Sequence, residues 1–141
     1  QTAEDKNLRN AALYLEWGKV LEKFEKYDEA KSKLLKALEL DAENVEINSY
    51  LGLCCAARKE LDEAKPLLEK ALEKEPENKV VKQALGIIAY ENDETYKALE
   101  LLRSDDEDAV NSYYLAKCYE KLNNDTKVKD YYENAIYCSF Y

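Results

Sequence analysis

The chain has 141 residues, enough for one domain to bury a sizeable core without disulfides. Its 46% hydrophobic and 36% charged residues exclude a disordered chain, and no apolar run approaches the roughly 20 residues that span a bilayer. The net charge of −9 argues against nucleic acid or anionic lipid as the main ligand. The lack of histidine removes the commonest general base and metal ligand, so the counts favour a binding module and predict no cofactor.

The first ten residues are polar and carry no apolar signal segment, so 1–10 is predicted to be an N-terminal extension. A cytoplasmic location is expected on this basis. Because the chain does not begin with Met, a processed exported protein stays open as the alternative.

Small residues recur at one period along the chain. The glycines Gly18, Gly52 and Gly86 are separated by 34 residues each time, and the tetrapeptide at 36–39 returns at 70–73. The same step relates two further sets, Ala30, Ala64 and Ala98, and Leu34, Leu68 and Leu102. A 34-residue repeat is therefore the first organising feature of the sequence.

Each unit is predicted to be a pair of helices. In the second unit, two segments with helical apolar spacing are separated by the polar pair Lys59-Glu60. A glycine within a helix costs roughly 0.5–1 kcal/mol relative to alanine, so its recurrence indicates a steric need. We expect Gly52 to lie opposite Ala64 and to set a short distance between the two helices.

These units resemble the tetratricopeptide repeat family, whose 34-residue helical hairpins carry a large-Leu-Gly-Tyr…Ala…Phe…Ala…Pro pattern. The matching residues are Tyr14, Trp17, Gly18, Leu21, Tyr27, Ala30, Leu34 and Ala37, then Leu51, Gly52, Cys55, Ala64, Leu68, Ala71 and Pro76. The resemblance implies an all-α fold, an α-solenoid in which about four hairpins stack into a right-handed superhelix. The predicted repeats are 11–44, 45–78, a shortened 79–108, and 109–141.

The third unit is four residues short, because the motif of the fourth unit returns after 30 residues. The deletion is predicted to remove about one turn from the end of the second helix of this unit. Residues 104–108, Ser-Asp-Asp-Glu-Asp, replace that turn. We interpret them as a turn and helix N-cap, since a calcium loop would need a central glycine and a ligand spacing that are absent.

The fourth unit ends without the polar capping helix that usually closes such arrays. Val128, Tyr132, Ala135 and Ile136 are expected to pack on their own hairpin. The side chains left without an obvious partner, a candidate oligomer edge, are Tyr131, Tyr137, Cys138, Phe140 and Tyr141. Either further repeats follow in the natural protein or this edge docks onto another subunit.

By the resemblance, the first helix of each unit lines a concave groove that binds a partner. Helical spacing on those helices gives the candidate partner-binding residues Leu15, Lys19, Glu46, Tyr50, Leu53, Gln83, Ile87, Tyr90, Tyr113 and Lys117. The middle of this groove is expected to be apolar and aromatic, with packing between first helices as the alternative for Leu53 and Ile87.

Some family members bind acidic chaperone tails through a clamp of lysines, asparagines and arginine. The corresponding places here lack the required cations, so a ligand with positive charge beside an apolar core is expected instead. The predicted function is a protein-protein interaction module, an adaptor or scaffold that binds a peptide or helix, with no nucleic acid and no membrane insertion. The alternative is a structural spacer or oligomerisation segment that self-associates through its C-terminal edge.

The cysteines are interpreted as small buried residues of a reducing compartment. Cys54 and Cys55 are adjacent on one helix, and neither they nor Cys118 and Cys138 form a metal-binding pair. With no glycine-rich phosphate loop and no base to activate a thiol, the chain is not expected to be an enzyme.

Overall fold

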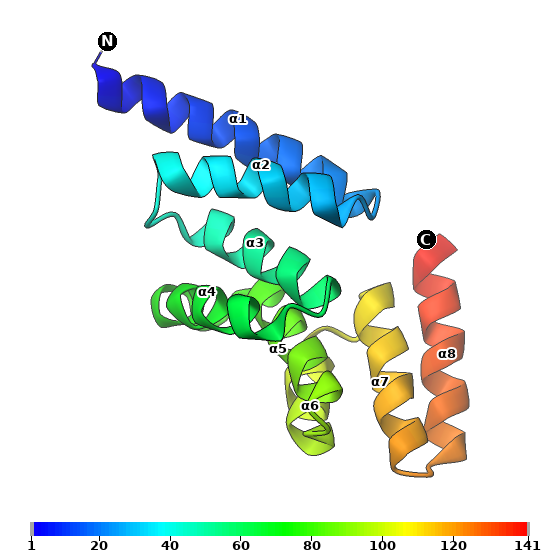
Figure 1. The fold of residues 1–141 in the computed structure, drawn as a ribbon. Helices are drawn as coiled ribbons and strands as arrows, with labels where there is room; N and C mark the ends of the chain where they lie inside the picture. Colours follow the sequence, from blue (N-terminus) through cyan, green and yellow to red (C-terminus); the bar gives the residue numbers. More distant parts are fainter. Residues whose placement is uncertain (1, 141) are drawn as a thin grey trace. The chain divides into compact units, whose positions relative to one another are not determined.

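The computed structural model describes residues 2–140, which fold into eight α-helices and contain no strand (Figure 1). The helices are α1 (Ala3–Lys23), α2 (Tyr27–Leu40), α3 (Val45–Ala57), α4 (Leu61–Lys74), α5 (Lys79–Glu91), α6 (Thr95–Leu102), α7 (Ala109–Lys121) and α8 (Asp125–Phe140). A short 3₁₀ helix, Arg103–Asp105, follows α6. Since α1 begins at Ala3, most of the predicted extension belongs to the same helix as the first repeat motif.

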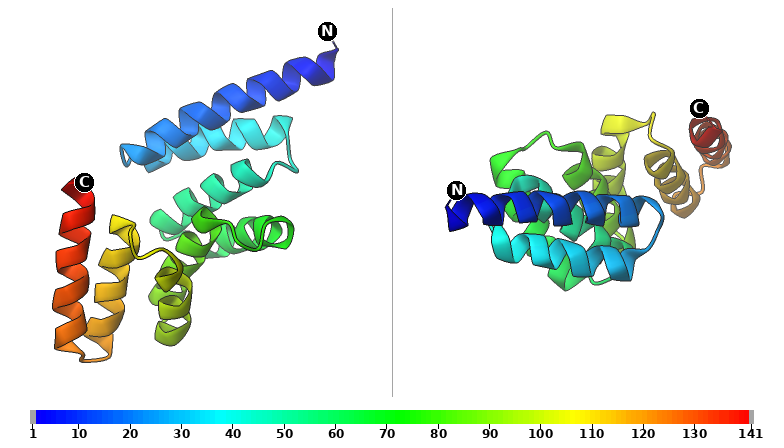
Figure 2. Two further views of the ribbon diagram at one scale, coloured as in Figure 1. Left: turned by 180° about the vertical axis from the view of Figure 1, so that it is seen from behind. Right: turned by 90° about the horizontal axis from the view of Figure 1, so that it is seen from above.

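The chain divides into two compact units, Gln1–Val81 and Lys82–Tyr141, with the boundary in the first turn of α5. In the first unit, α1 packs against α2, α2 against α3, and α3 against α4. In the second unit, α6 packs against α7 and α7 against α8. The pairs α1–α2 and α7–α8 lie side by side in all views (Figure 2).

Side-chain caps start the first helices of the later hairpins. Asn44 Oδ1 accepts a hydrogen bond from the backbone N–H of Ile47 at 3.1 Å, and Asn78 does the same for Val81 at 3.1 Å. Each bond satisfies one of the N–H groups that a helix leaves unpaired at its first turn. The two capping asparagines are 34 residues apart, which is the period of the sequence repeat.

The turn inside each hairpin contains one residue in the left-handed backbone region. These residues are Glu25, Lys59, Asp93 and Asn123, with φ between 57° and 63°. In the first turn the N–H of Lys26 donates to the carbonyl of Leu21 and that of Glu25 to Glu22, a pairing that ends helices when the reversing residue is left-handed. Glycine usually fills this position, but in this chain the glycines lie inside helices.

Each glycine faces a leucine sixteen residues later in the chain. A β-carbon placed at Gly52 would lie 2.5 Å from Leu68 Cδ2, and one at Gly18 would lie 2.6 Å from Leu34 Cγ. The prediction that Ala64 lies opposite Gly52 is therefore wrong. The residue opposite Gly52, where the two helices cross, is Leu68. The steric need itself is confirmed, since no side chain fits at Gly52 unless Leu68 moves.

The third hairpin is shorter than the second, as the deletion predicts. Helix α6 has 8 residues where α4 has 14. Asp108 caps α7 by accepting from the N–H of Asn111 at 3.0 Å, so the acidic segment provides a turn and an N-cap. The core of the second unit then forms around Leu102, Leu115 and other buried side chains of α6 and α7.

Candidate functional site

The ten predicted partner-binding residues all lie on first helices of hairpins, five in each unit. Leu15, Lys19, Glu46, Tyr50 and Leu53 belong to the first unit, and Gln83, Ile87, Tyr90, Tyr113 and Lys117 to the second. Their side chains differ in exposure.

Three of the predicted apolar contacts are buried. The exposed fractions of Leu15, Leu53 and Ile87 are 5%, 7% and 5%. These fractions leave too little surface for any of the three to anchor a partner, and packing accounts for them. The apolar middle expected for the groove is therefore reduced to its aromatic side chains.

In the first unit, the predicted polar residues bind each other. Lys19 Nζ on α1 lies 2.8 Å from a carboxylate oxygen of Glu46 on α3 and 5.3 Å from the ring centre of Tyr50. The hydrogen bond to Glu46 raises the pKa of Lys19, and burial raises the pKa of Tyr50. The result is a charged bridge between two first helices, with a half-buried tyrosine beside it.

In the second unit, four tyrosines from three helices form one cluster, which we call the tyrosine cluster: Tyr90, Tyr113, Tyr114 and Tyr132. Tyr114 makes edge-to-face contacts with Tyr90 and Tyr113, with ring centres 5.6 and 5.2 Å apart. The Tyr113 ring also meets that of Tyr132 on α8 at 6.1 Å. Such contacts fix ring orientation, and the Tyr113 side chain remains 43% exposed.

Two lysines of α7 lie against the tyrosine cluster. Lys121 Nζ is 4.0 Å from the ring centre of Tyr90 and donates to Asp93 at 2.7 Å. Lys117 Nζ is 5.7 Å from the Tyr113 ring centre. The hydroxyls of Tyr113 and Tyr132, together with the carboxylate of Glu120, raise the pKa of Lys117. Because Lys121 is paired with Asp93 and Lys117 with Glu120 at 3.7 Å, the cluster offers an aromatic face bordered by ion pairs.

Gln83 takes part in an internal network. Its amide nitrogen donates to Asp108 at 2.9 Å and to Asn111 at 2.8 Å, which ties α5 to the start of α7. Burial of Asn111 in the second unit leaves this amide little freedom to turn outward. Gln83 thus fixes the helix that carries Tyr113 as well as lying on the predicted surface.

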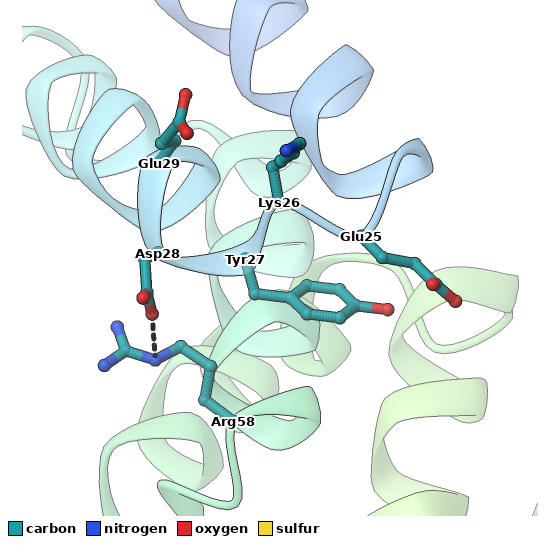
Figure 3. A pocket seen from close by; sticks show the side chains of 6 residues that line it. All are labelled: Glu25, Lys26, Tyr27, Asp28, Glu29 and Arg58. Carbon is teal, nitrogen blue, oxygen red and sulfur yellow. Dashed lines mark ion pairs between the residues drawn. The ribbon is translucent and has the colours of Figure 1, made fainter.

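A depression of about 340 Å³ lies at the turn between α1 and α2 (Figure 3). Its lining consists of Glu25, Lys26, Tyr27, Asp28, Glu29 and Arg58. Arg58 Nε is 3.2 Å from a carboxylate oxygen of Asp28, and the figure shows this pair pointing toward each other. Tyr27 is part of the repeat motif, but none of the six was predicted to belong to a site, since they lie at polar turns. The lining contains no nucleophile paired with a base.

The C-terminal edge is only partly as predicted. The Tyr131 ring stacks on that of Tyr119 at 5.7 Å and packs against the core of the second unit, so its assignment to an open edge is wrong. Ile136, expected to be packed, is 60% exposed. Tyr137 and Phe140 are 62% and 79% exposed, and Tyr141 lies outside the described residues. The exposed surface of α8 therefore includes Ile136 and does not include Tyr131.

The cysteines lie inside the helices as free thiols. Cys54, Cys55 and Cys118 are buried and Cys138 is half-buried. Burial raises the pKa of Cys54 to about 12 and that of Cys118 to about 11, which keeps both thiols protonated at neutral pH. Within residues 2–140, no group of three or more His, Cys, Asp or Glu side chains could hold a metal ion.

No helix in the part of the chain that the structure describes is both long enough and apolar enough to cross a bilayer.

Known structures share this fold. The structure of PilF from Pseudomonas aeruginosa matches 97% of the chain with a TM-score of 0.69 at 20% sequence identity, and the match covers 63% of the PilF chain. MamA (MSR-1) matches 92% of the chain with a TM-score of 0.60 at 20% identity, covering 76% of its own chain. A MamA point mutant matches 91% with a TM-score of 0.59 at 21% identity, over 77% of its chain. The chain therefore spans less than two thirds of PilF.

No curated protein sequence is significantly similar to the chain. The family model for the tetratricopeptide repeat matches residues 21–88 and, one repeat later, 56–118. Together with the all-α hairpins and the shared fold, this match confirms the fold class that the resemblance implied. The chain belongs to the tetratricopeptide repeat family.

Proposed function

We propose that the protein is an interaction module without catalytic activity, an adaptor or scaffold that holds a peptide or helix of a partner protein. Membership of the tetratricopeptide repeat family supports a role in protein-protein interaction. The proposed contact lies on the first helices of the hairpins. It consists of the tyrosine cluster in the second unit, with the Lys19–Glu46 bridge and Tyr50 as a separate contact on the first unit.

The observation that supports this proposal is that the ring of Tyr113 is both fixed by its neighbours and exposed. Its ring is held between Tyr114 and Tyr132, yet 43% of the side chain is exposed. A ring already fixed by its neighbours loses little conformational entropy when a partner covers it. Tyrosine also offers a hydroxyl at the edge of a large apolar face, which suits a binding surface.

The partner segment is proposed to carry an apolar or aromatic residue with a basic residue nearby. The apolar residue would cover the Tyr113 ring. The basic residue would lie near Glu120, whose carboxylate accepts from the Tyr132 hydroxyl at 2.8 Å and lies 3.7 Å from Lys117. Opposite charge around an aromatic anchor gives orientation and selectivity more than affinity.

The test is selection of peptides from a displayed random library on the immobilised chain, followed by calorimetric titration of the winning peptide. We expect Tyr113→Ala to weaken binding at least tenfold. The matched control is Tyr96→Ala, because Tyr96 is 75% exposed on α6 and lies outside the tyrosine cluster. Helical circular dichroism must be equal for all three proteins.

Equal affinity of the wild type and Tyr113→Ala would remove the tyrosine cluster from the proposed site. A selection that enriches no peptide would contradict the peptide-binding function itself.

The second candidate function is structural, with the chain acting as a spacer or oligomerisation segment. The exposure of Tyr137 and Phe140 on the last described helix favours it. In that case light scattering would find a stable oligomer that disappears in Tyr137→Glu/Phe140→Glu, whereas Tyr113→Ala would leave it intact.

A further inference from the structure

The rings of the tyrosine cluster stand at steep angles to one another. The angle between ring planes is 69° for Tyr90 and Tyr114, 89° for Tyr114 and Tyr113, and 64° for Tyr113 and Tyr132. In such an edge-to-face series the face of one ring borders the edge of the next, so the rings form corners instead of one flat surface. A compact, rigid apolar ring can fill such a corner without losing rotamer freedom, whereas a long flexible side chain would lose it.

Three hydroxyls of the cluster are available as hydrogen-bond donors. Tyr132 donates to Glu120 at 2.8 Å, whereas the hydroxyls of Tyr90, Tyr113 and Tyr114 form no hydrogen bond with any residue of 2–140. A phenolic hydroxyl donates one hydrogen bond, and side chains form most of their hydrogen bonds with backbone groups or water. The cluster is therefore suited to a segment whose backbone carbonyls are still unpaired.

A helical segment would offer few such carbonyls. The carbonyls of an α-helix are paired within the helix except in its last turn, and a helix binds a surface through a long apolar side. The aliphatic residue of α5 that was predicted to receive such a side, Ile87, is only 5% exposed. Val110 on α7, one turn before Tyr113, is 45% exposed and adds a single aliphatic side chain. The surface therefore favours an extended segment over a helix.

A polyproline II helix has the properties that the cluster requires. It has no internal hydrogen bonds, so its backbone carbonyls are free to accept. With three residues per turn, it brings every third side chain to the same side, about 9 Å apart. Its proline rings are compact, and the chain is already extended before it binds, so little conformational entropy is lost. Aromatic surfaces in other domains recognise proline-rich segments on these physical grounds.

The charge of the second unit favours a basic ligand. Residues 82–141 include 7 basic and 12 acidic residues, a net charge of −5. Burial and the carboxylate of Glu91 raise the pKa of Tyr114, which places this carboxylate at the cluster. The lysines that border the cluster are paired with other carboxylates, as Lys121–Asp93 at 2.7 Å, Lys117–Glu120 at 3.7 Å and Lys129–Glu133 at 3.9 Å. A basic residue in the ligand would therefore complement this surface.

We propose that the segment bound by the tyrosine cluster is a proline-rich polyproline II helix that also carries a basic residue. A proline ring packs beside the exposed ring of Tyr113, and the basic residue lies near Glu120. The unpaired tyrosine hydroxyls donate to backbone carbonyls of the segment. This inference rests on the proposed function, because it names the class of segment that the same site binds.

The experiment compares two displayed libraries of short peptides on the immobilised full chain. In one library proline is fixed at every third position and the other positions are random. In the second library alanine replaces each fixed proline. The best binder of each library is synthesised and titrated by calorimetry. We expect the proline peptide to bind at least tenfold more tightly than the alanine peptide, and replacement of its basic residues by glutamate to weaken binding about tenfold.

Tyr113→Phe separates the contribution of the hydroxyl from that of the ring. Because phenylalanine keeps the ring, folding is expected to survive, and equal helical circular dichroism checks this. Loss of one hydrogen bond should weaken binding of the proline peptide by about three- to tenfold. The matched control is Tyr96→Phe, which removes a hydroxyl from a side chain that is 75% exposed outside the cluster, and which should bind like the wild type.

Two results would overturn the inference. One is equal affinity of the chain for the proline and alanine peptides, and the other is equal affinity of the wild type and Tyr113→Phe for the proline peptide. The proposed function fails separately. If only the alanine library or the fully random library yields a peptide that depends on Tyr113, the site binds another class of segment and this inference alone is wrong. If no library yields a binding peptide, both are wrong.

Discussion

The α-carbon of Gly52 lies so close to Leu68 that a β-carbon at Gly52 would be 2.5 Å from Leu68 Cδ2 and 2.6 Å from Leu68 Cγ. Real β-carbons essentially never approach a neighbour this closely. The relation between a glycine of the first helix and a leucine of the second returns in the other two hairpins that contain a glycine. The distance between the paired helices is therefore set by a missing side chain.

We expect Gly52→Ala to destabilise the protein. In an open helix position this change would stabilise it by roughly 0.5–1 kcal/mol, because alanine restricts the unfolded chain more than glycine does. Here the methyl group forces Leu68 or the helix to move, and overpacking of this kind costs about 1–3 kcal/mol. The free energy of unfolding from a urea titration measures the effect.

Leu68→Ala provides the control for this clash. The double variant Gly52→Ala/Leu68→Ala should lose less stability than the two single variants together, because the second change removes the atoms that the methyl group meets. A Gly52→Ala protein as stable as the wild type would refute the steric interpretation.

Glu25→Gly is expected to increase stability. Glu25 has a φ of 60°, a left-handed conformation that strains a residue with a β-carbon, whereas glycine adopts it freely. The net gain should be about 0.5–1 kcal/mol once the greater freedom of glycine in the unfolded chain is subtracted. Asn123→Gly, at the equivalent turn, should gain less because asparagine tolerates this region well. Thermal unfolding that ranks the two variants in the opposite order would contradict the argument.

The pH dependence of stability should depend in part on Lys31. Its Nζ lies 2.7 Å from a carboxylate oxygen of Glu60 and 2.9 Å from one of Glu63, which links α2 to the start of α4. The hydrogen bond from Lys31 lowers the pKa of Glu60 below its ordinary value of 4.5. Because the folded pKa is the lower one, this contribution is present above the unfolded pKa and disappears as pH falls through the folded pKa.

We therefore expect the melting temperature of Lys31→Met to be lower than that of the wild type at pH 7 and to change less on acidification below about pH 5. Lys97→Met is the control, since Lys97 forms only an exposed ion pair with Glu94 at 3.8 Å. Parallel pH profiles for the wild type and Lys31→Met would show that this link does not contribute to acid stability.

Thiol reactivity should divide the cysteines into two groups. Since burial raises the pKa values of Cys54, Cys55 and Cys118, their thiolate fraction at neutral pH is very small. Cys138 is half-buried on the last described helix. A disulfide reagent at pH 8 should modify Cys138 in the folded protein and the other three only after unfolding. In Cys138→Ser the fast phase should be absent, and its persistence would place a reactive thiol in the interior.

The 34-residue period was sufficient to predict the hairpins, because the small residues that recur are those that the helix crossings require. The four-residue deletion likewise predicted the short α6 and the Asp108 cap. Spacing alone could not identify the residue opposite Gly52, because the crossing point depends on how two helices meet in space. For the same reason it left Leu53 and Ile87 open between the groove and packing between first helices, and both are buried.

The repeat register also carries information about exposure, as Trp17 shows. Trp17 matches the family motif, and its side chain is 46% exposed. Comparing it with Leu51 one repeat later shows that the same position is buried only when a hairpin precedes it. Tyr131 was assigned to an open edge because no pattern in the sequence reveals that the ring of Tyr119 stacks on it.

Within each unit, helices mostly contact the helices next to them in the chain, and α1 also contacts α3. Contacts of such short sequence separation close small loops, which makes folding fast for the size of the protein. Stability then behaves as a sum of terms for each hairpin and each junction between neighbours, so unfolding is expected to begin at terminal hairpins and spread inward. Amide hydrogen exchange would therefore be slowest in α3, a helix that is covered on both sides in its own unit.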